Sequence, residues 1–401
     1  MQPPSAANAN RFEALDGWRG LCACLVVMFH FHGYSPIYSW GLIRNSYLFV
    51  DFFFVLSGFV IAWNYAMRLD SWQGVRRFLL LRVGRVYPLH LFMLLCFLAY
   101  EVLRHLSARA QPSPFPTFEG GTAPIALLSH FFLVHSLHLH DGLTWNGPSW
   151  SISTELWTYV LFALLSVWLG VRNWMLGLVA LAAPLLLVHL SRTGMDTTYD
   201  WGLIRCVFGF ALGTACYQIL RLWPQVQRTL PAKPGVMTML ECLMVGAVIV
   251  FVAAAGTTAL SFLAPFVFAV AVLVFSVEAG WLSRLLRTPL LKWLGMLSYS
   301  IYMTHFIFVL VLPRLVKRLV RQDLWTPMPL PTGQYVMVFG RDNVEGTLLY
   351  GAVLALTVAF SAFTYRWIET PGRDWTRRWV RGAKPSGATL GQSGTNSAPV
   401  P

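Results

Sequence analysis

The chain has 401 residues, of which 56% are hydrophobic and only 12% are charged. A soluble protein of this length carries about twice that share of charged residues, so the composition excludes an ordinary soluble globular protein. The excess of 13 positive charges is better explained by basic loops beside membrane spans than by nucleic acid, and we expect no nucleic-acid partner.

Apolar stretches of about twenty residues recur along the chain, the length that crosses a bilayer as a helix. They predict one all-α polytopic transmembrane bundle over residues 11–375, after a polar tail (1–10) and before a basic and then disordered tail (376–401). The predicted spans are 12–34, 47–66, 85–104, 150–170, 174–191, 201–220, 236–256, 258–280, 292–313 and 347–368. Segment 122–139 is apolar but short and interrupted by histidines, and we interpret it as not crossing.

The distribution of Lys and Arg predicts the orientation, because cytoplasmic loops carry an excess of these residues. If 122–139 does not cross, the basic loops at 67–85, 221–235 and 281–292 face the cytoplasm, and so do both termini. One basic group opposes this rule because it then lies outside, just past the ninth span: Arg314, Lys317, Arg318 and Arg321. A ligand or an amphipathic surface helix would account for that group.

The first span carries two ionisable residues on one face. Arg19 and His30 are eleven residues apart, which brings their side chains to within roughly 20° of one another around a helix. They stand about 16 Å apart along the axis, half the thickness of a ~30 Å hydrocarbon core. Ionisable groups inside a membrane helix are costly and usually functional. We therefore expect a site that is reached from one side and used nearer the other.

The predicted topology places two imidazoles and two carboxylates in one outer layer: His30, Asp51, Glu155 and His305. A histidine beside a carboxylate is the minimal apparatus of general-base catalysis, and we expect His30 and Glu155 to touch. Helix packing for His305 and a helix cap for Asp51 are the plainer alternatives.

On the inner side, Arg82 and Arg85 lie three residues apart at the mouth of the third span. Clustered guanidiniums at a cytoplasmic entrance suit phosphates, and they also suit lipid headgroups or simply set topology. Four histidines between 130 and 140 resemble a metal cluster only weakly, since their spacing is not that of helical ligands, and we expect no metal. The six cysteines form no metal or redox spacing, and we expect no disulfide.

Six segments follow one another in order along the chain: RFEALDGWRGLCACLVVMFHF, FVDFFFVLSGFVIA, FLLLRVGRVYPLH, NGPSWSISTELWTYV, LGMLSYSIYMTHF and WIETPGRDW. Together they resemble the acyltransferase 3 family of multi-pass membrane acyltransferases. That family moves an acyl group, usually acetyl, from cytoplasmic acyl-CoA to a carbohydrate hydroxyl. The resemblance implies acetyl-CoA or another acyl-CoA as donor, without a metal.

The resemblance implies His30 as the catalytic residue and three ligands of the donor: Arg19, Arg82 and Arg85. Glu155 and His305 match later motifs of the family. We expect Glu155 to act with His30, as a group that orients the imidazole. The expected acceptor-binding residues are Asp51, Trp150, Tyr302 and His305.

The predicted protein is thus a membrane O-acyltransferase, in contact with membrane lipid and placed in a bacterial inner membrane. Its acceptor is a carbohydrate or glycolipid, and the sequence leaves open the acceptor's identity, the acyl length, the oligomeric state and whether His30 acts as base or acyl carrier. A transporter or flippase with a buried His/carboxylate relay is the alternative. Consumption of acyl-CoA by the purified protein separates the two.

Overall fold

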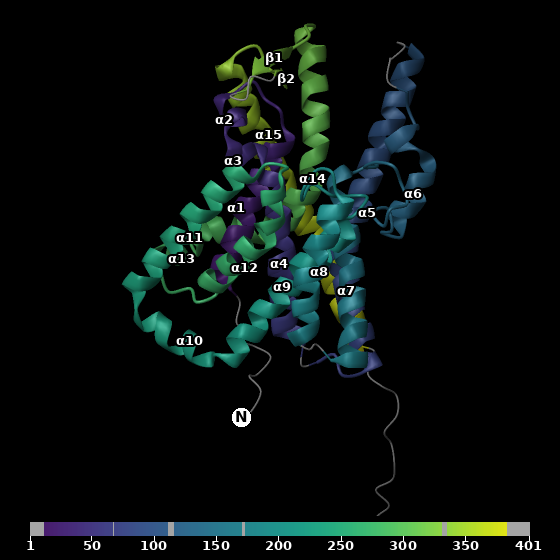
Figure 1. Ribbon diagram of the computed structural model, residues 1–401. Helices are drawn as coiled ribbons and strands as arrows, with labels where there is room; N and C mark the ends of the chain where they lie inside the picture. Colours follow the sequence, from purple (N-terminus) through teal and green to yellow (C-terminus); the bar gives the residue numbers. More distant parts are fainter. Residues whose placement is uncertain (1–11, 67, 111–115, 171–172, 331–334, 383–401) are drawn as a thin grey trace, which may run out of the picture.

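The computed structural model describes residues 12–66, 68–110, 116–170, 173–330 and 335–382. It is 79% helical, and the one sheet in these ranges is a two-stranded hairpin. Figure 1 shows the long helices running side by side, with the hairpin at the upper end. The all-α class predicted from the apolar stretches is therefore confirmed, apart from the hairpin.

Ten helices overlap the predicted spans: α1 (Glu13–His30), α4 (Phe49–Tyr65), α5 (Trp72–Ala110), α7 (Trp150–Leu169), α8 (Asn173–Leu190), α9 (Gly202–Leu222), α11 (Pro234–Ala255), α12 (Ala264–Phe275), α14 (Pro289–Val320) and α15 (Asn343–Thr364). The other helices are α2 (Pro36–Ser39), α3 (Gly41–Arg44), α6 (Pro124–Phe131), α10 (Pro224–Thr229), α13 (Trp281–Leu286) and α16 (Thr370–Gly382). Strands β1 (Trp325–Pro329) and β2 (Tyr335–Phe339) pair antiparallel, with Trp325 opposite Phe339.

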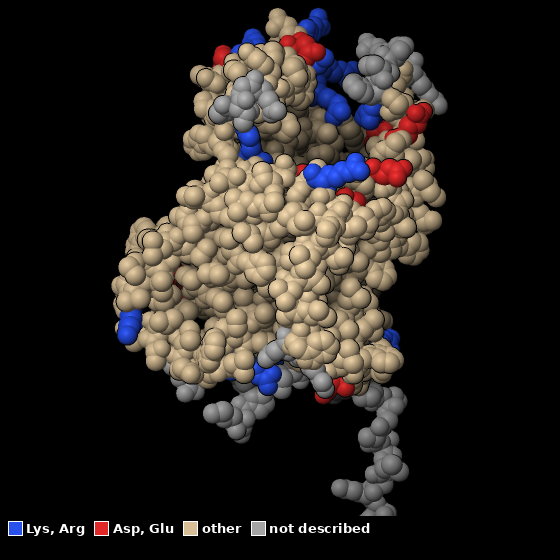
Figure 2. Space-filling view, in the orientation of Figure 1, with Lys and Arg blue, Asp and Glu red and all other residues tan. Residues whose placement is uncertain are grey.

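Within the described ranges, 7 helices are long and apolar enough to cross a membrane by length and composition. Helices α8 and α12 are also apolar, but they are shorter than these seven. Helix α1 carries acidic residues in its first turn. Figure 2 shows charged side chains at the two ends of the molecule and a broad belt without them between. This distribution is that of an integral membrane protein.

Two boundaries bear on the site. The third span begins at Trp72 rather than at residue 85, so Arg82 and Arg85 lie inside a continuous helix of 39 residues and not at a loop. The loop prediction was wrong because a helix needs only about twenty residues to cross, and α5 extends well beyond that length. By contrast, α6 has 8 residues and rises only about 12 Å. It is too short to cross, as we expected for 122–139.

Helices α1 and α14 pack closely because glycines face each other. A Cβ atom at Gly20 would lie 2.6 Å from the backbone nitrogen of Gly295, so no larger residue fits there. Small residues let membrane helices approach in this way. The contact brings the polar face of α1, with Arg19 and His30, against residues of α14 that are about 275 positions away in the chain.

Candidate active site

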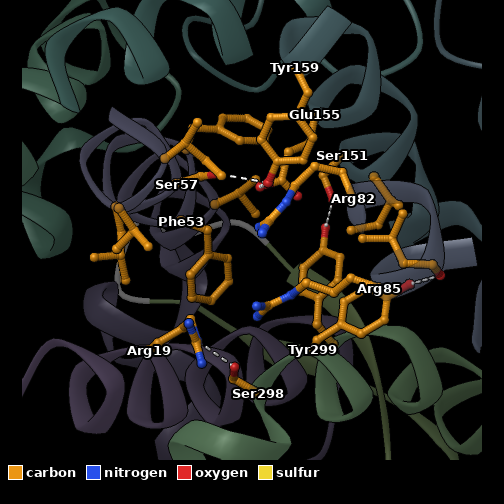
Figure 3. A pocket seen from close by; sticks show the side chains of 18 residues that line it. Arg19, Phe53, Ser57, Arg82, Arg85, Ser151, Glu155, Tyr159, Ser298 and Tyr299 are labelled. Carbon is orange, nitrogen blue, oxygen red and sulfur yellow. Dashed lines mark hydrogen bonds between the residues drawn. The ribbon is translucent and has the colours of Figure 1, made fainter. Parts of the chain in front are cut away.

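A cavity of about 130 Å³ lies inside the bundle between α1, α4, α5, α7 and α14. Three arginines and one glutamate line it: Arg19, Arg82, Arg85 and Glu155. Figure 3 shows Arg82 beside Glu155 and Tyr159 on one side of the cavity and Arg19 beside Ser298 on the other, with Arg85 entering between them. The three arginines that the sequence marked as donor ligands thus line one cavity.

The arginines differ in how many of their donors are used. Arg19 is held by Ser298 Oγ at 2.7 Å and by the Gly295 carbonyl at 2.8 Å. Arg82 donates to Tyr65 Oη at 3.2 Å, but its buried Nε has no partner. Arg85 makes no side-chain hydrogen bond to any residue in the described ranges, although Glu369 and Glu155 act on it electrostatically.

Unfilled guanidinium donors are the groups that bind phosphate and carboxylate oxygens best, because two parallel N–H bonds match the spacing of two such oxygens. The unfilled donors of Arg82 and Arg85 belong to one cavity and one helix, α5. The cavity is therefore suited to an anionic group, with apolar walls from α4 along its remaining surface.

Glu155 lines the cavity but does not touch His30. Its Oε1 accepts a hydrogen bond from Tyr159 Oη at 2.6 Å, and Tyr159 in turn contacts Ser57 Oγ at 2.8 Å. The predicted contact between Glu155 and His30 is wrong, because α14 and not α7 packs along α1 at this level. The partner of His30 is His305.

The two histidines form a pair with one consistent protonation pattern. His30 Nδ1 lies 2.9 Å from the Val26 carbonyl, and His305 Nδ1 lies 2.6 Å from the Tyr302 carbonyl. Since a carbonyl only accepts, both Nδ1 atoms carry the proton. His305 Nε2, 3.2 Å from His30 Nδ1, is then an acceptor.

This pattern leaves Nε2 of His30 as a free lone pair. The His30 side chain is half-buried, whereas His305 is fully buried. Tyr302, one helical turn before His305, lines the arginine cavity and accepts a hydrogen bond from Ser151 Oγ at 2.9 Å. The pair therefore stands next to the cavity, with one basic nitrogen available for a proton transfer.

Asp51 and Trp150 do not lie where the sequence placed them. Asp51 is fully buried, and both of its oxygens are held by Arg205, at 2.9 and 2.7 Å. The guanidinium of Arg205 also stacks on the Trp150 ring at 5.3 Å. Neither Asp51 nor Trp150 lines the cavity. Their predicted contact with an acceptor is replaced by a buried ion pair that joins α4 to α9.

Sequence reasoning missed two charged residues of this region. Arg205 lies in the first turn of α9, at the start of an otherwise apolar span, and a charge in such a span is itself a signal for a buried partner. Glu369 is 2% exposed, accepts a hydrogen bond from Ser300 Oγ at 2.9 Å, and ends a π-helical turn, Tyr365–Glu369. Such π turns are frequent at functional sites, and the WIETP segment already contained this glutamate.

Three histidines of α5, α6 and the segment after α6 stack instead of converging. The rings of His130 and His135 lie 3.7 Å apart, and His90 lies 5.8 Å from His130. No group of three or more His, Cys, Asp or Glu residues in the described parts of the chain is arranged to hold a metal ion. Burial lowers the pKa of His135 to about 3 and also lowers that of His130. This stack is therefore neutral at pH 7.

Comparison with known proteins gives one family. A family model described as an acyltransferase domain matches residues 12–366. The chain is 25% identical to the membrane-bound transacylase BcsY of Komagataeibacter xylinus, over 95% of this chain and 88% of that protein. It is 23% identical to the peptidoglycan O-acetyltransferase OatA of Listeria monocytogenes, over 90% of this chain and 55% of that protein.

A shorter match, 36% identical over 117 residues, is to the acyltransferase MdmB of Streptomyces mycarofaciens, and it covers 29% of this chain and 27% of that protein. No solved structure matches the chain.

Proposed function

The chain belongs to the acyltransferase family whose model spans it, and we propose that this membrane O-acyltransferase takes its acyl group, acetyl in the simplest case, from cytoplasmic acyl-CoA. The proposed acceptor is a hydroxyl of a carbohydrate or glycolipid. The proposed location is the bacterial inner membrane. One observation carries the proposal: a cavity with unfilled arginine donors adjoins a histidine pair with one free nitrogen.

In this proposal, the arginines bind the phosphates of the donor. Arg82 and Arg85 have guanidinium N–H groups to give, and Arg19, already held by α14, adds positive charge. Glu155 and Glu369 are acidic neighbours of Arg85, and they keep its side chain in the cavity without filling its donors. The pantetheine arm of the donor then runs along the apolar wall of α4 toward Tyr302 and the histidine pair.

The reaction needs one base. Nε2 of His30 takes the proton of the acceptor hydroxyl, and the oxygen attacks the thioester carbonyl carbon. The C–S bond breaks as the C–O bond forms, and the imidazolium returns its proton to the departing thiolate, which leaves as free CoA thiol. The thioester supplies the driving force. If His30 instead carries the acyl group, the same Nε2 atom forms the bond.

His305 is a positioning residue in this scheme. Its Nε2 accepts from Nδ1–H of His30, which fixes the tautomer and stabilises the charge that develops on the imidazole during proton transfer. The carboxylate that usually fills this position in a triad is replaced here by a neutral imidazole. Because His305 and not Glu155 is the partner of His30, we assign Glu155 to the donor side of the cavity, beside Arg85.

Donor binding by the purified full-length protein tests the proposal. We expect Arg85→Gln to weaken acetyl-CoA binding at least tenfold, because hydrogen bonds to charged groups contribute about 1.5–3 kcal/mol each. Arg85→Lys keeps the charge without the two-pronged geometry, so its acetyl-CoA affinity should lie between those of wild type and Arg85→Gln. Arg284→Gln is the matched control, since Arg284 is exposed on α13 and does not line the cavity. Unchanged affinity in Arg85→Gln would mean that the cavity does not hold the donor.

A further inference from the structure

The outer end of α14 carries a row of arginines that the proposed chemistry does not use. Arg314 and Arg318 lie four residues apart on one face of α14, and Arg321 follows at the residue that caps the end of the helix. All three are exposed. Figure 2 shows the molecule hollowed at its upper end, with Lys and Arg side chains along the hollow. We call these three residues the outer arginine row.

The row is not neutralised by acidic side chains. In the described ranges, Arg318 and Arg321 make no side-chain hydrogen bond or ion pair, and Arg314 donates only to the Leu310 carbonyl of its own helix, at 2.8 Å. The neighbouring Lys317 does have an acidic partner, Asp323, at 2.7 Å. Charges of one sign that a protein leaves unpaired on one face attract ligands of the other sign.

The row faces a second wall formed by α5. The guanidinium of Arg314 lies 5.8 Å from the ring of Tyr100, and the Tyr100 hydroxyl has no partner in the described chain. One turn deeper, Phe97 of α5 contacts Phe306 of α14, and Phe306 contacts His30. Phe306 and Phe97 therefore stand between Arg314 and the proposed catalytic histidine, at the base of the hollow.

Helix lengths place the row beyond the hydrocarbon. Helix α14 has 32 residues, or about 48 Å, against a hydrocarbon thickness of about 30 Å. Arg314 stands about 14 Å beyond His305 along the axis, and Arg321 about 24 Å. An oligosaccharide bound at the row is long enough to reach His30, whereas a small neutral acceptor would not contact both the row and His30.

We propose that the outer arginine row binds a negatively charged acceptor, a saccharide chain with carboxylate or phosphate groups, and delivers its hydroxyl to His30. This inference rests on the proposed function and on the predicted orientation, in which the row faces outward. Outward-facing loops close to a span normally avoid Lys and Arg. A ligand that needs the positive charge explains why this face keeps it.

Anionic lipid headgroups are the competing occupant, because they carry the same phosphate chemistry. We favour the saccharide for two reasons. The row runs on to the end of α14, about 24 Å beyond His305 at Arg321, and its Arg314 end contacts Tyr100 of α5 instead of facing the surrounding lipid.

The test uses the full chain in nanodiscs of neutral phosphatidylcholine. Binding of a fluorescent oligogalacturonate and of a phosphorylated malto-oligosaccharide is compared with that of a neutral malto-oligosaccharide of equal length. The test variant is Arg318→Gln with Arg321→Gln, which leaves Arg314 on its aromatic ring. The control is Arg221→Gln with Arg284→Gln, which removes the same charge from exposed positions at the other end. Acetyl-CoA binding is measured on every sample.

We expect at least one anionic probe to bind about tenfold more tightly than the neutral one, with an affinity that falls as salt rises. The test variant should lose most of that difference, and the control should keep it. Equal binding of charged and neutral probes, or an unaffected test variant, would overturn the inference. A lipid occupant would also overturn it. In that case wild type would lose probe binding in phosphatidylglycerol nanodiscs, and the test variant would retain less phosphatidylglycerol than wild type. Acetyl-CoA binding that is absent from wild type, with probe discrimination intact, would instead reject the proposed function alone.

Discussion

Replacing His305 tests how the histidine pair works. His305→Leu removes the acceptor of the His30 Nδ1 proton and keeps a buried apolar side chain in a fully buried position. The Nδ1 proton of His30 retains one acceptor, the Val26 carbonyl at 2.9 Å, so the preference for this tautomer is weakened but not lost. A net hydrogen bond contributes about 0.5–1.5 kcal/mol, which corresponds to roughly a two- to thirteen-fold lower turnover.

Removing the base itself is far more costly, at about 10²–10⁴-fold. The expected order is therefore wild type, His305→Leu and then His30→Ala, with the acetyl-CoA KM of His305→Leu unchanged. His305→Gln provides the control, because a side-chain carbonyl can again accept from Nδ1 and should restore part of the loss. The assay is release of CoA thiol by the purified protein in the presence of an acceptor.

Two results would refute this reasoning. Turnover of His305→Leu at the wild-type level would mean that the contact with His30 has no role. A loss as large as that of His30→Ala, with no further loss in the double variant, would make His305 part of the chemical step, since groups that act as one unit are grossly non-additive.

Three further predictions concern the frame around the site. Asp51→Asn should destabilise the fold by about 3–5 kcal/mol, because it leaves a buried arginine uncompensated; thermal unfolding in detergent measures this, and an unchanged midpoint would contradict it. The stack of His130 and His135 should lose stability as the pH falls from about 6.5 toward 3, because the pKa of His135 is lowered to about 3 in the folded chain and the unfolded chain binds the proton more readily. Backbone hydrogen exchange around the stack should be faster at pH 5 than at pH 7, and His135→Asn should reduce this pH dependence. In a cysteine-free background, a single Cys at Leu319 should react with an impermeant maleimide from outside and one at Thr229 only from the cytoplasm; the reverse labelling would overturn the orientation.

The sequence predicted the order of the helices well, because an apolar stretch of about twenty residues is a strong local signal. It also placed Arg19 and His30 on one face of α1, since helical spacing is local too. It missed the start of α5, because arginines at the end of an apolar stretch look like a loop even when the helix continues through them.

Partners across the bundle were harder to predict. The choice of His305 over Glu155 as neighbour of His30 depends on the close approach of α1 and α14 at Gly20 and Gly295. Nothing local in either segment records that approach. Asp51 was misread for the same reason, since its partner Arg205 lies 154 residues away in an apolar helix.

The central claim is that acyl-CoA bound in the arginine cavity is consumed at His30. The most direct measurement follows acetyl-CoA binding and CoA release by purified wild type and His30→Ala side by side. The claim predicts equal acetyl-CoA affinity and a release rate about 10²–10⁴-fold lower in the variant. A correctly folded His30→Ala protein that releases CoA at the wild-type rate would contradict it.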